Sequence, residues 1–208
     1  MTDPMEAASL DLEFPFTGRW LVQNSPADRV PSHGTTMFAT SFSIDFVPVD
    51  DAGRSAVFTL GSLLRSEPPG NFTGFGRSVL APTDGTVMTV HDSEFDHPAY
   101  RGLPSLGYAL TQRRRAEAGW RALAGNHVMI KSSGGIVALC HLQRGSARVR
   151  PGQDVHVGQE IGRCGNSGNS TEPHLHVQAL DGSDIERAAA RRISFRGSLP
   201  SNGSIIAV

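Results

Sequence analysis

The clearest hydrophobic pattern lies near the end of the chain, where a glycine-rich segment, residues 165–170, runs into an alternating strand at residues 174–179. Successive side chains of a strand point to opposite faces of its sheet. His174, His176 and Gln178 therefore share one face, and the apolar residues between them share the other. The pattern predicts a strand that buries its apolar side and presents two imidazoles side by side.

A second alternating stretch covers residues 40–47. Phe42, Ile44 and Phe46 fall on one side, and Asp45 falls on the other. We predict a strand that carries a carboxylate on the face away from its apolar row.

Short apolar runs separated by glycine turns predict hairpins. Residues 77–90 are typical of a strand, a tight turn and a second strand, and residues 126–142 predict another hairpin. In that second hairpin, the alternation puts His141 on the opposite face from Cys140. Residues 148–165 predict a third meander of short strands.

Strands at this spacing indicate a mainly β protein, an antiparallel β-sandwich or flattened barrel. We predict one domain over residues 14–200, with a disordered N-terminus at residues 1–13 and a loose tail at residues 201–208. Residues 91–125 form a partly helical insertion, with a short helix within residues 109–124. The insertion is either a wall of a substrate site or a solvated, arginine-rich surface.

Composition and charge exclude several classes of partner and of site. The 208 residues carry a formal net charge of -1 and a single lysine, Lys131, so we expect no nucleic-acid partner. Two cysteines are too few for a disulfide scaffold or a cysteine zinc site. No apolar run reaches membrane-spanning length and no signal peptide is visible, so we expect no membrane span. The chain as written is typical of a cytoplasmic protein, or of the cell envelope if a leader was removed.

A hydrolytic zinc site needs three nitrogen or oxygen ligands and an open position for water. His33 in a proline-rich loop, Asp45 on its strand and His176 form one such set. Each residue taken alone is as well explained by contact with water. The strand pattern by itself leaves His174 and His176 interchangeable.

Further histidines lie outside this set. The pairs at residues 91–92 and 96–97 join a histidine to an aspartate but lack a strand framework, so we expect no second metal. His127 either lines a cleft or is a structural histidine with its hydrogen bonds satisfied.

Five ordered blocks resemble the M23 (LytM/lysostaphin-type) zinc endopeptidases. The blocks are residues 31–34, 42–46, 79–87, 139–142 and 165–176. The resemblance implies a LytM-like fold with a duplicated hybrid motif and one Zn²⁺ per chain. It also implies an endopeptidase that hydrolyses peptide bonds, above all in peptidoglycan stem or cross-bridge peptides.

Carried over residue by residue, the resemblance makes His33, Asp45 and His176 the metal ligands. His141 and His174 match the two catalytic histidines that bind no metal. The chain departs from the pattern in two ways: His33 and Asp45 are further apart than in many members, and Cys140 replaces a small or aromatic residue. Neither departure removes a ligand.

The same resemblance implies attack by a zinc-bound water, with the two catalytic histidines moving protons and stabilising the oxyanion. The glycine-rich segment becomes the floor of a peptide groove. The residues that we expect to bind substrate are Asn166, Ser167, Asn169, Ser170 and His127.

Other functions stay open. One is a non-catalytic LytM-like regulatory or binding module, which the complete ligand set disfavours, and another is a peptidase of a non-cell-wall peptide. A biotinyl or phosphotransferase hybrid barrel would need a presented lysine or a phosphorylated histidine in different surroundings, and Lys131 lacks the suitable motif. The oligomeric state is not determined by the sequence.

Overall fold

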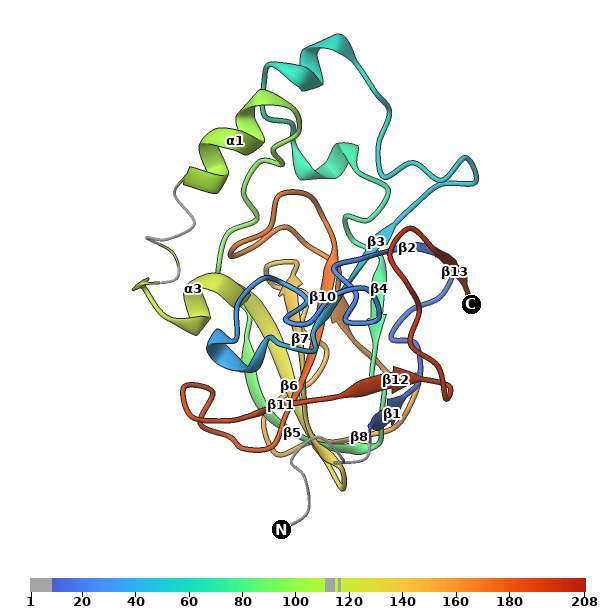
Figure 1. Ribbon diagram of the computed structural model, residues 1–208, viewed down its shortest axis with the longest axis vertical. Helices are drawn as coiled ribbons and strands as arrows, with labels where there is room; N and C mark the ends of the chain where they lie inside the picture. Colours follow the sequence, from blue (N-terminus) through green and yellow to red (C-terminus); the bar gives the residue numbers. More distant parts are fainter. Residues whose placement is uncertain (1–8, 111–114, 116) are drawn as a thin grey trace.

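The computed structural model describes residues 9–110, 115 and 117–208. Among them, one antiparallel sheet of nine strands forms the body of the molecule (Figure 1). From one edge to the other, its path contains β13 (Ile205–Ala207), β2 (Arg19–Gln23), β3 (Ile44–Pro48), β10 (Leu175–Leu180), β7 (Gly135–Leu142), β6 (Asn126–Ser132), β5 (Gly85–His91) and β8 (Asp154–Val155). Off this path, β11 (Ala190–Arg191) pairs with β10. The sheet is open, because its edge strands do not pair with each other.

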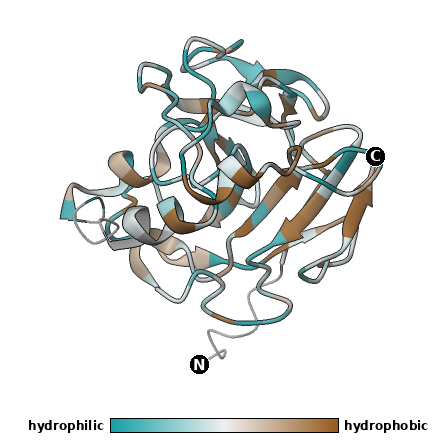
Figure 2. Ribbon diagram, turned by 90° about the horizontal axis from the view of Figure 1, so that it is seen from above, coloured by the Kyte–Doolittle hydropathy of each residue, from teal (hydrophilic) through white to brown (hydrophobic). Residues whose placement is uncertain are grey.

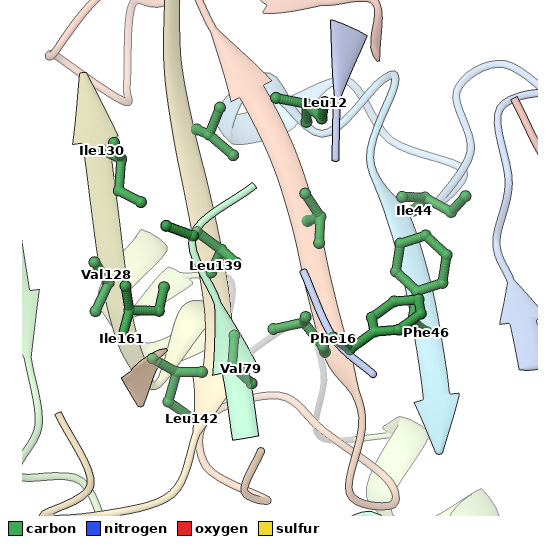
Figure 3. Close-up of a cluster of buried hydrophobic side chains, with 14 of the residues drawn as sticks. Leu12, Phe16, Ile44, Phe46, Val79, Val128, Ile130, Leu139, Leu142 and Ile161 are labelled. Carbon is green, nitrogen blue, oxygen red and sulfur yellow. The ribbon is translucent and has the colours of Figure 1, made fainter. Parts of the chain in front are cut away.

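Two small sheets complete the β structure. In one, β4 (Ser78–Leu80) pairs antiparallel with β9 (Glu160–Arg163), and in the other β1 (Leu10–Leu12) runs parallel to β12 (Ile193–Phe195). Their apolar side chains pack on one face of the large sheet, as Figure 3 shows for Leu12 and Val79. The mainly β, antiparallel fold that the sequence predicted is confirmed.

Alternation explains which face of the large sheet is buried in this core. On β10, Leu175 and Val177 belong to the core, whereas His176 and Gln178 line a cleft on the other side. Figure 2 shows apolar residues concentrated along the strands and hydrophilic residues along many of the surrounding loops. The large sheet thus separates a dry core from a polar site.

Helices are few and short. The α-helices with described bounds are α1 (Leu103–Leu110) and α3 (Trp120–Ala124), and the 3-10 helices are η2 (Met37–Ala39), η3 (Leu60–Leu63) and η4 (Pro69–Asn71). The predicted helix of the insertion does end at Gly125, whose φ of 62° terminates α3. No helix of the described residues is long and apolar enough to cross a membrane.

The structure corrects three predictions of local structure. The hairpin at residues 77–90 does not form, because β4 pairs with β9 while β5 pairs with β6 in the large sheet. Both predicted loose ends contain strands, β1 and β13, because each finds a distant partner strand. Residues 1–8 and two of the three consecutive arginines, Arg113 and Arg114, lie outside the described residues.

Candidate active site

Three predicted metal ligands meet on the cleft side of the large sheet. Asp45 and His176 face each other directly across β3 and β10, and His33 enters from the loop after β2. Asp45 Oδ1 lies 2.9 Å from His176 Nδ1, and Asp45 Oδ2 lies 3.0 Å from His33 Nε2. The ligand atoms all lie within 4.8 Å of one another, the one such group found among the described residues.

The hydrogen bonds behind His33 indicate which nitrogen it offers. The Ser43 hydroxyl donates to the carbonyl of Thr40 at 2.7 Å, so it accepts from His33 Nδ1–H at 2.8 Å. The bare Nε2 of His33 then faces the Asp45 carboxylate. Two acceptors that face each other at this distance are stabilised by a cation between them, so the residues present fit a zinc ion.

Asp45 is a buried carboxylate surrounded by imidazoles. Burial raises its pKa, but protonation of the His33 and His174 rings, with the hydrogen bonds that His176 and His33 donate when protonated, outweighs this and holds the pKa well below its ordinary value. Asn24 adds a hydrogen bond from Nδ2 to Oδ2 at 2.7 Å. Asp45 is therefore ionised at neutral pH.

Two further imidazoles lie beside the ligand set. The rings of His141 and His174 are 4.6 Å apart, and His174 Nε2 lies 3.8 Å from Asp45 Oδ1. Each ring donates its Nδ1–H to a backbone carbonyl, His141 to Ser167 at 2.9 Å and His174 to Glu172 at 2.8 Å. A ring held in this way has Nε2 as a proton acceptor in its neutral form.

Burial, with the neighbouring His174 and His176, lowers the pKa of His141 well below its ordinary value. The ring of His141 is accordingly neutral at pH 7. A neutral imidazole with a fixed tautomer is suited to accept a proton from a reacting group.

The position of His141 depends on a β-bulge that alternation cannot predict. Along β6 and β7 the register shifts by one, from Leu139 opposite Val128 to Leu142 opposite Asn126. The extra residue places His141 in the left-handed region, with φ of 63°. His141 therefore lines the cleft on the same side as Cys140, which corrects the predicted opposite faces.

The ligand set and both histidines line one cleft of about 360 Å³. Its apolar wall includes Phe38, Trp120 and Leu123, so the insertion does contribute to the cleft. Arg29 and Arg115 also line it. The sequence did not single out Arg29 as a site residue, whereas Arg115 belongs to the insertion that it gave as a possible wall of a substrate site. Nothing in the local pattern around Arg29 or Asn24 indicates such a position.

Of the five predicted substrate-binding residues, Asn169 lines the cleft, where its Oδ1 accepts a hydrogen bond from Arg115 Nε at 2.7 Å. The other four are buried and do not line it: Asn166, Ser167, Ser170 and His127. Glycine-rich loops often approach ligands closely, but the polar side chains of this loop point inward and hydrogen-bond within the protein.

Each buried side chain of the loop makes a structural hydrogen bond. Ser167 Oγ donates to the carbonyl of Leu142 at 2.9 Å, and Asn166 Nδ2 donates to the carbonyl of His97 at 2.8 Å. Ser170 Oγ lies 2.9 Å from His174 Nδ1. These bonds hold the loop that supplies carbonyl partners to both catalytic histidine candidates.

The aspartates of the insertion are also structural. Asp92 accepts hydrogen bonds from the backbone amides of Ser146 and Ala147, and Asp96 accepts them from Arg144 and Asn166. Their carboxylates join the insertion to the loops after β7 and β9.

Comparisons with a family profile and with characterised relatives agree on one protein family. The sequence profile of Peptidase family M23 matches residues 108–186, a stretch that contains His141, His174 and His176. The chain is 33% identical over 88 residues to glycyl-glycine endopeptidase ALE-1 of Staphylococcus capitis, covering 42% of this chain. It is 28% identical over 109 residues to peptidoglycan DD-endopeptidase ShyC of Vibrio cholerae serotype O1, covering 52%. Each alignment spans 24% of the relative, so the chain matches about a quarter of either protein's length.

Solved structures give weaker matches. The catalytic domain of lysostaphin from Staphylococcus simulans aligns with 76% of this chain and 79% of its own, at 18% identity and a TM-score of 0.41. A zinc-containing peptidase from Vibrio cholerae aligns with 69% of this chain and 37% of its own, at 23% identity and a TM-score of 0.37.

Proposed function

On its match to peptidase family M23 over residues 108–186, we propose that the chain is a zinc-dependent endopeptidase of that family, acting on peptidoglycan stem or cross-bridge peptides. The observation that carries the proposal is the convergence of His33, Asp45 and His176 in one cleft. Two aligned relatives bear the names of a glycyl-glycine and a peptidoglycan DD-endopeptidase, which supports the substrate class.

Zinc held by His33, Asp45 and His176 would polarise the scissile carbonyl and lower the pKa of a bound water. The chain supplies the proton transfers. His141 and His174 keep Nε2 toward the cleft because Nδ1 of each is anchored to a carbonyl. One ring takes a proton from the attacking water, and the pair can return one to the leaving amine.

The cleft also supplies orientation. Phe38 and Trp120 form an apolar wall that excludes water from the bond being cleaved. Arg29 and Arg115 offer donors to the backbone carbonyls or carboxylates of a peptide lying in the cleft.

Metal content and hydrolysis together test the site. The wild type should purify with about one zinc per chain, and Asp45→Ala or His176→Ala should lose it because two donors cannot hold the ion. His174→Ala should keep zinc but lose hydrolysis by about 10²-fold or more. His156→Ala, which changes an exposed histidine, is the control for both measurements. Full zinc and full activity in Asp45→Ala would contradict the ligand assignment.

The substrate is tested by incubating zinc-loaded protein with purified sacculi and with defined stem and cross-bridge peptides. Mass spectrometry should reveal new amino and carboxyl termini within those peptides. Zinc-loaded protein that yields no products from any of them would instead favour the regulatory module.

A further inference from the structure

Behind the candidate ligand His176 lies Gln178, a buried side chain with no role in the chemistry proposed above. Gln178 is 1% exposed and follows His176 on the same face of β10. Its Oε1 lies 3.0 Å from His176 Nε2, and its Nε2 donates to the carbonyl of Phe38 at 2.9 Å. Both ends of the amide are therefore used.

These two contacts determine the direction of the amide. A backbone carbonyl can only accept a hydrogen bond, so the group facing Phe38 is the NH₂ of Gln178. The oxygen is then turned to His176 Nε2, which must carry a proton to bond with it. In the neutral ring, the lone pair is left on Nδ1, the nitrogen that faces Asp45.

The carbonyl of Phe38 comes from a turn of unusual backbone geometry. Phe38 and Ala39 have φ values of 54° and 59°, in the left-handed region that residues other than glycine rarely adopt. Phe38 is 8% exposed and packs in an apolar cluster with Trp120 and Cys140. The packed cluster holds this turn in a conformation that aims the carbonyl at Gln178.

We infer that Gln178 is a positioning residue that orients His176 for the metal and ties this ligand to the η2 turn. The inference rests on the proposed function, because it takes His176 as a zinc ligand. Hydrogen-bond partners of metal-ligating histidines fix the ring and raise its basicity, and their loss weakens metal binding. The η2 turn also lines the cleft, so a shift of the cleft wall would be transmitted to the ligand set.

Two substitutions separate positioning from packing. Gln178→Leu keeps a similar volume but removes the acceptor for His176 Nε2–H. Gln178→Glu keeps that acceptor, but it sets a carboxylate oxygen against the Phe38 carbonyl. Gln23→Leu, at an exposed glutamine of the same cleft, is the matched control.

Zinc dissociation constants are measured by chelator competition, and the melting temperature is measured for the metal-free proteins. We expect Gln178→Leu to bind zinc about 10- to 100-fold more weakly. Gln178→Glu should bind zinc close to the wild-type affinity while its metal-free form melts at a lower temperature. Long-range ¹H–¹⁵N spectra should show the His176 proton on Nε2 in the wild type and in Gln178→Glu.

Wild-type affinity in Gln178→Leu, or an equal loss in both variants, would overturn the positioning role while zinc binding by the wild type stands. A wild-type protein that binds no zinc would instead overturn the proposed function and this inference with it. The two failures are therefore distinguishable.

Discussion

The imidazole of His127 is buried behind the cleft rather than inside it. It is 1% exposed, its ring packs on Trp120 with centroids 4.4 Å apart, and Nδ1 lies 2.7 Å from the carbonyl of Gly125. Burial, more than the nearby His91 and Arg121, lowers the pKa of His127 to about 4. The folded protein thus keeps this ring neutral where an unfolded chain would protonate it.

Because of His127, the free energy of unfolding should decrease as the pH is lowered. The unfolded ring takes up a proton below about pH 6.5 and the folded ring only near 4, so stability present above pH 6.5 is lost between these values. The loss from pH 7 to 5 should reach about 2 kcal/mol from this residue. Urea unfolding with chelator at both pH values should show a smaller loss in His127→Gln. The same pH dependence in both proteins would contradict a neutral buried His127.

At the scale of residues, the sequence predicted a side chain well wherever regular alternation persists. Asp45 and His176 fall on the cleft face because β3 and β10 are regular there. His141 was assigned to the wrong face because its direction depends on a bulge against β6, which is a property of the pair of strands. Arg29 was missed because loop geometry, and not periodicity, brings it to the cleft.

At the scale of elements, the loop before β10 packs tightly against the end of α3. A Cβ added to Gly168 would lie 2.4 Å from Gly125 N and 2.5 Å from the carbonyl oxygen of Leu123. Gly168 also has φ of 70°, which disfavours any side chain. The neighbouring carbonyl of Ser167 holds His141, so this contact positions a proposed catalytic histidine.

Gly168→Ala should separate the loop from the helix. Gly158→Ala is the matched control, because Gly158 has φ of 81° but nothing within 4 Å of an added Cβ. Both should lose about 1–2 kcal/mol from the left-handed backbone. Gly168→Ala should lose about 1–3 kcal/mol more from the clash, together with hydrolytic activity. Equal unfolding free energies for the two variants would show that the loop can yield without cost.

Element pairing was predictable only where it is local. The hairpin of β6 and β7 was predicted because a short turn joins its strands. The predicted pairing of β4 with β5 was wrong, because β4 pairs instead with β9, a strand far along the chain. β1 and β13 were missed for the same reason: short strands acquire order from their partners.

At the scale of the whole molecule, aromatic rings join the small sheet of β1 and β12 to the large sheet. Phe195, on β12, is fully buried, with its ring 5.2 Å from that of Phe46 on β3 and 5.1 Å from that of Phe14. Phe46 is the neighbour of Asp45 on its strand. The packing of the β1–β12 sheet on the large sheet therefore supports the strand that carries a proposed metal ligand.

Phe195→Ala should lower the free energy of unfolding by about 3–5 kcal/mol, because it removes a buried ring and leaves a cavity. Phe58→Ala is the control, since Phe58 is 61% exposed and its loss should change stability by no more than about 0.5 kcal/mol. Denaturant unfolding of the two variants checks the difference. A small loss of unfolding free energy in Phe195→Ala would mean that the large sheet is stable without this contact to the β1–β12 sheet.

The spacing of the proposed metal ligands along the chain has a consequence for folding. Asp45 and His176 are 131 positions apart and become neighbours only when β3 and β10 pair at the centre of the sheet. An unfolded chain therefore brings together at most part of the site, and its affinity for zinc is correspondingly low. Nearly all of the binding free energy of zinc would then appear as stability of the native sheet, increasing with the concentration of free metal. The concentration of free zinc in the surroundings would then set the fraction of the protein that is folded as well as the fraction that is active.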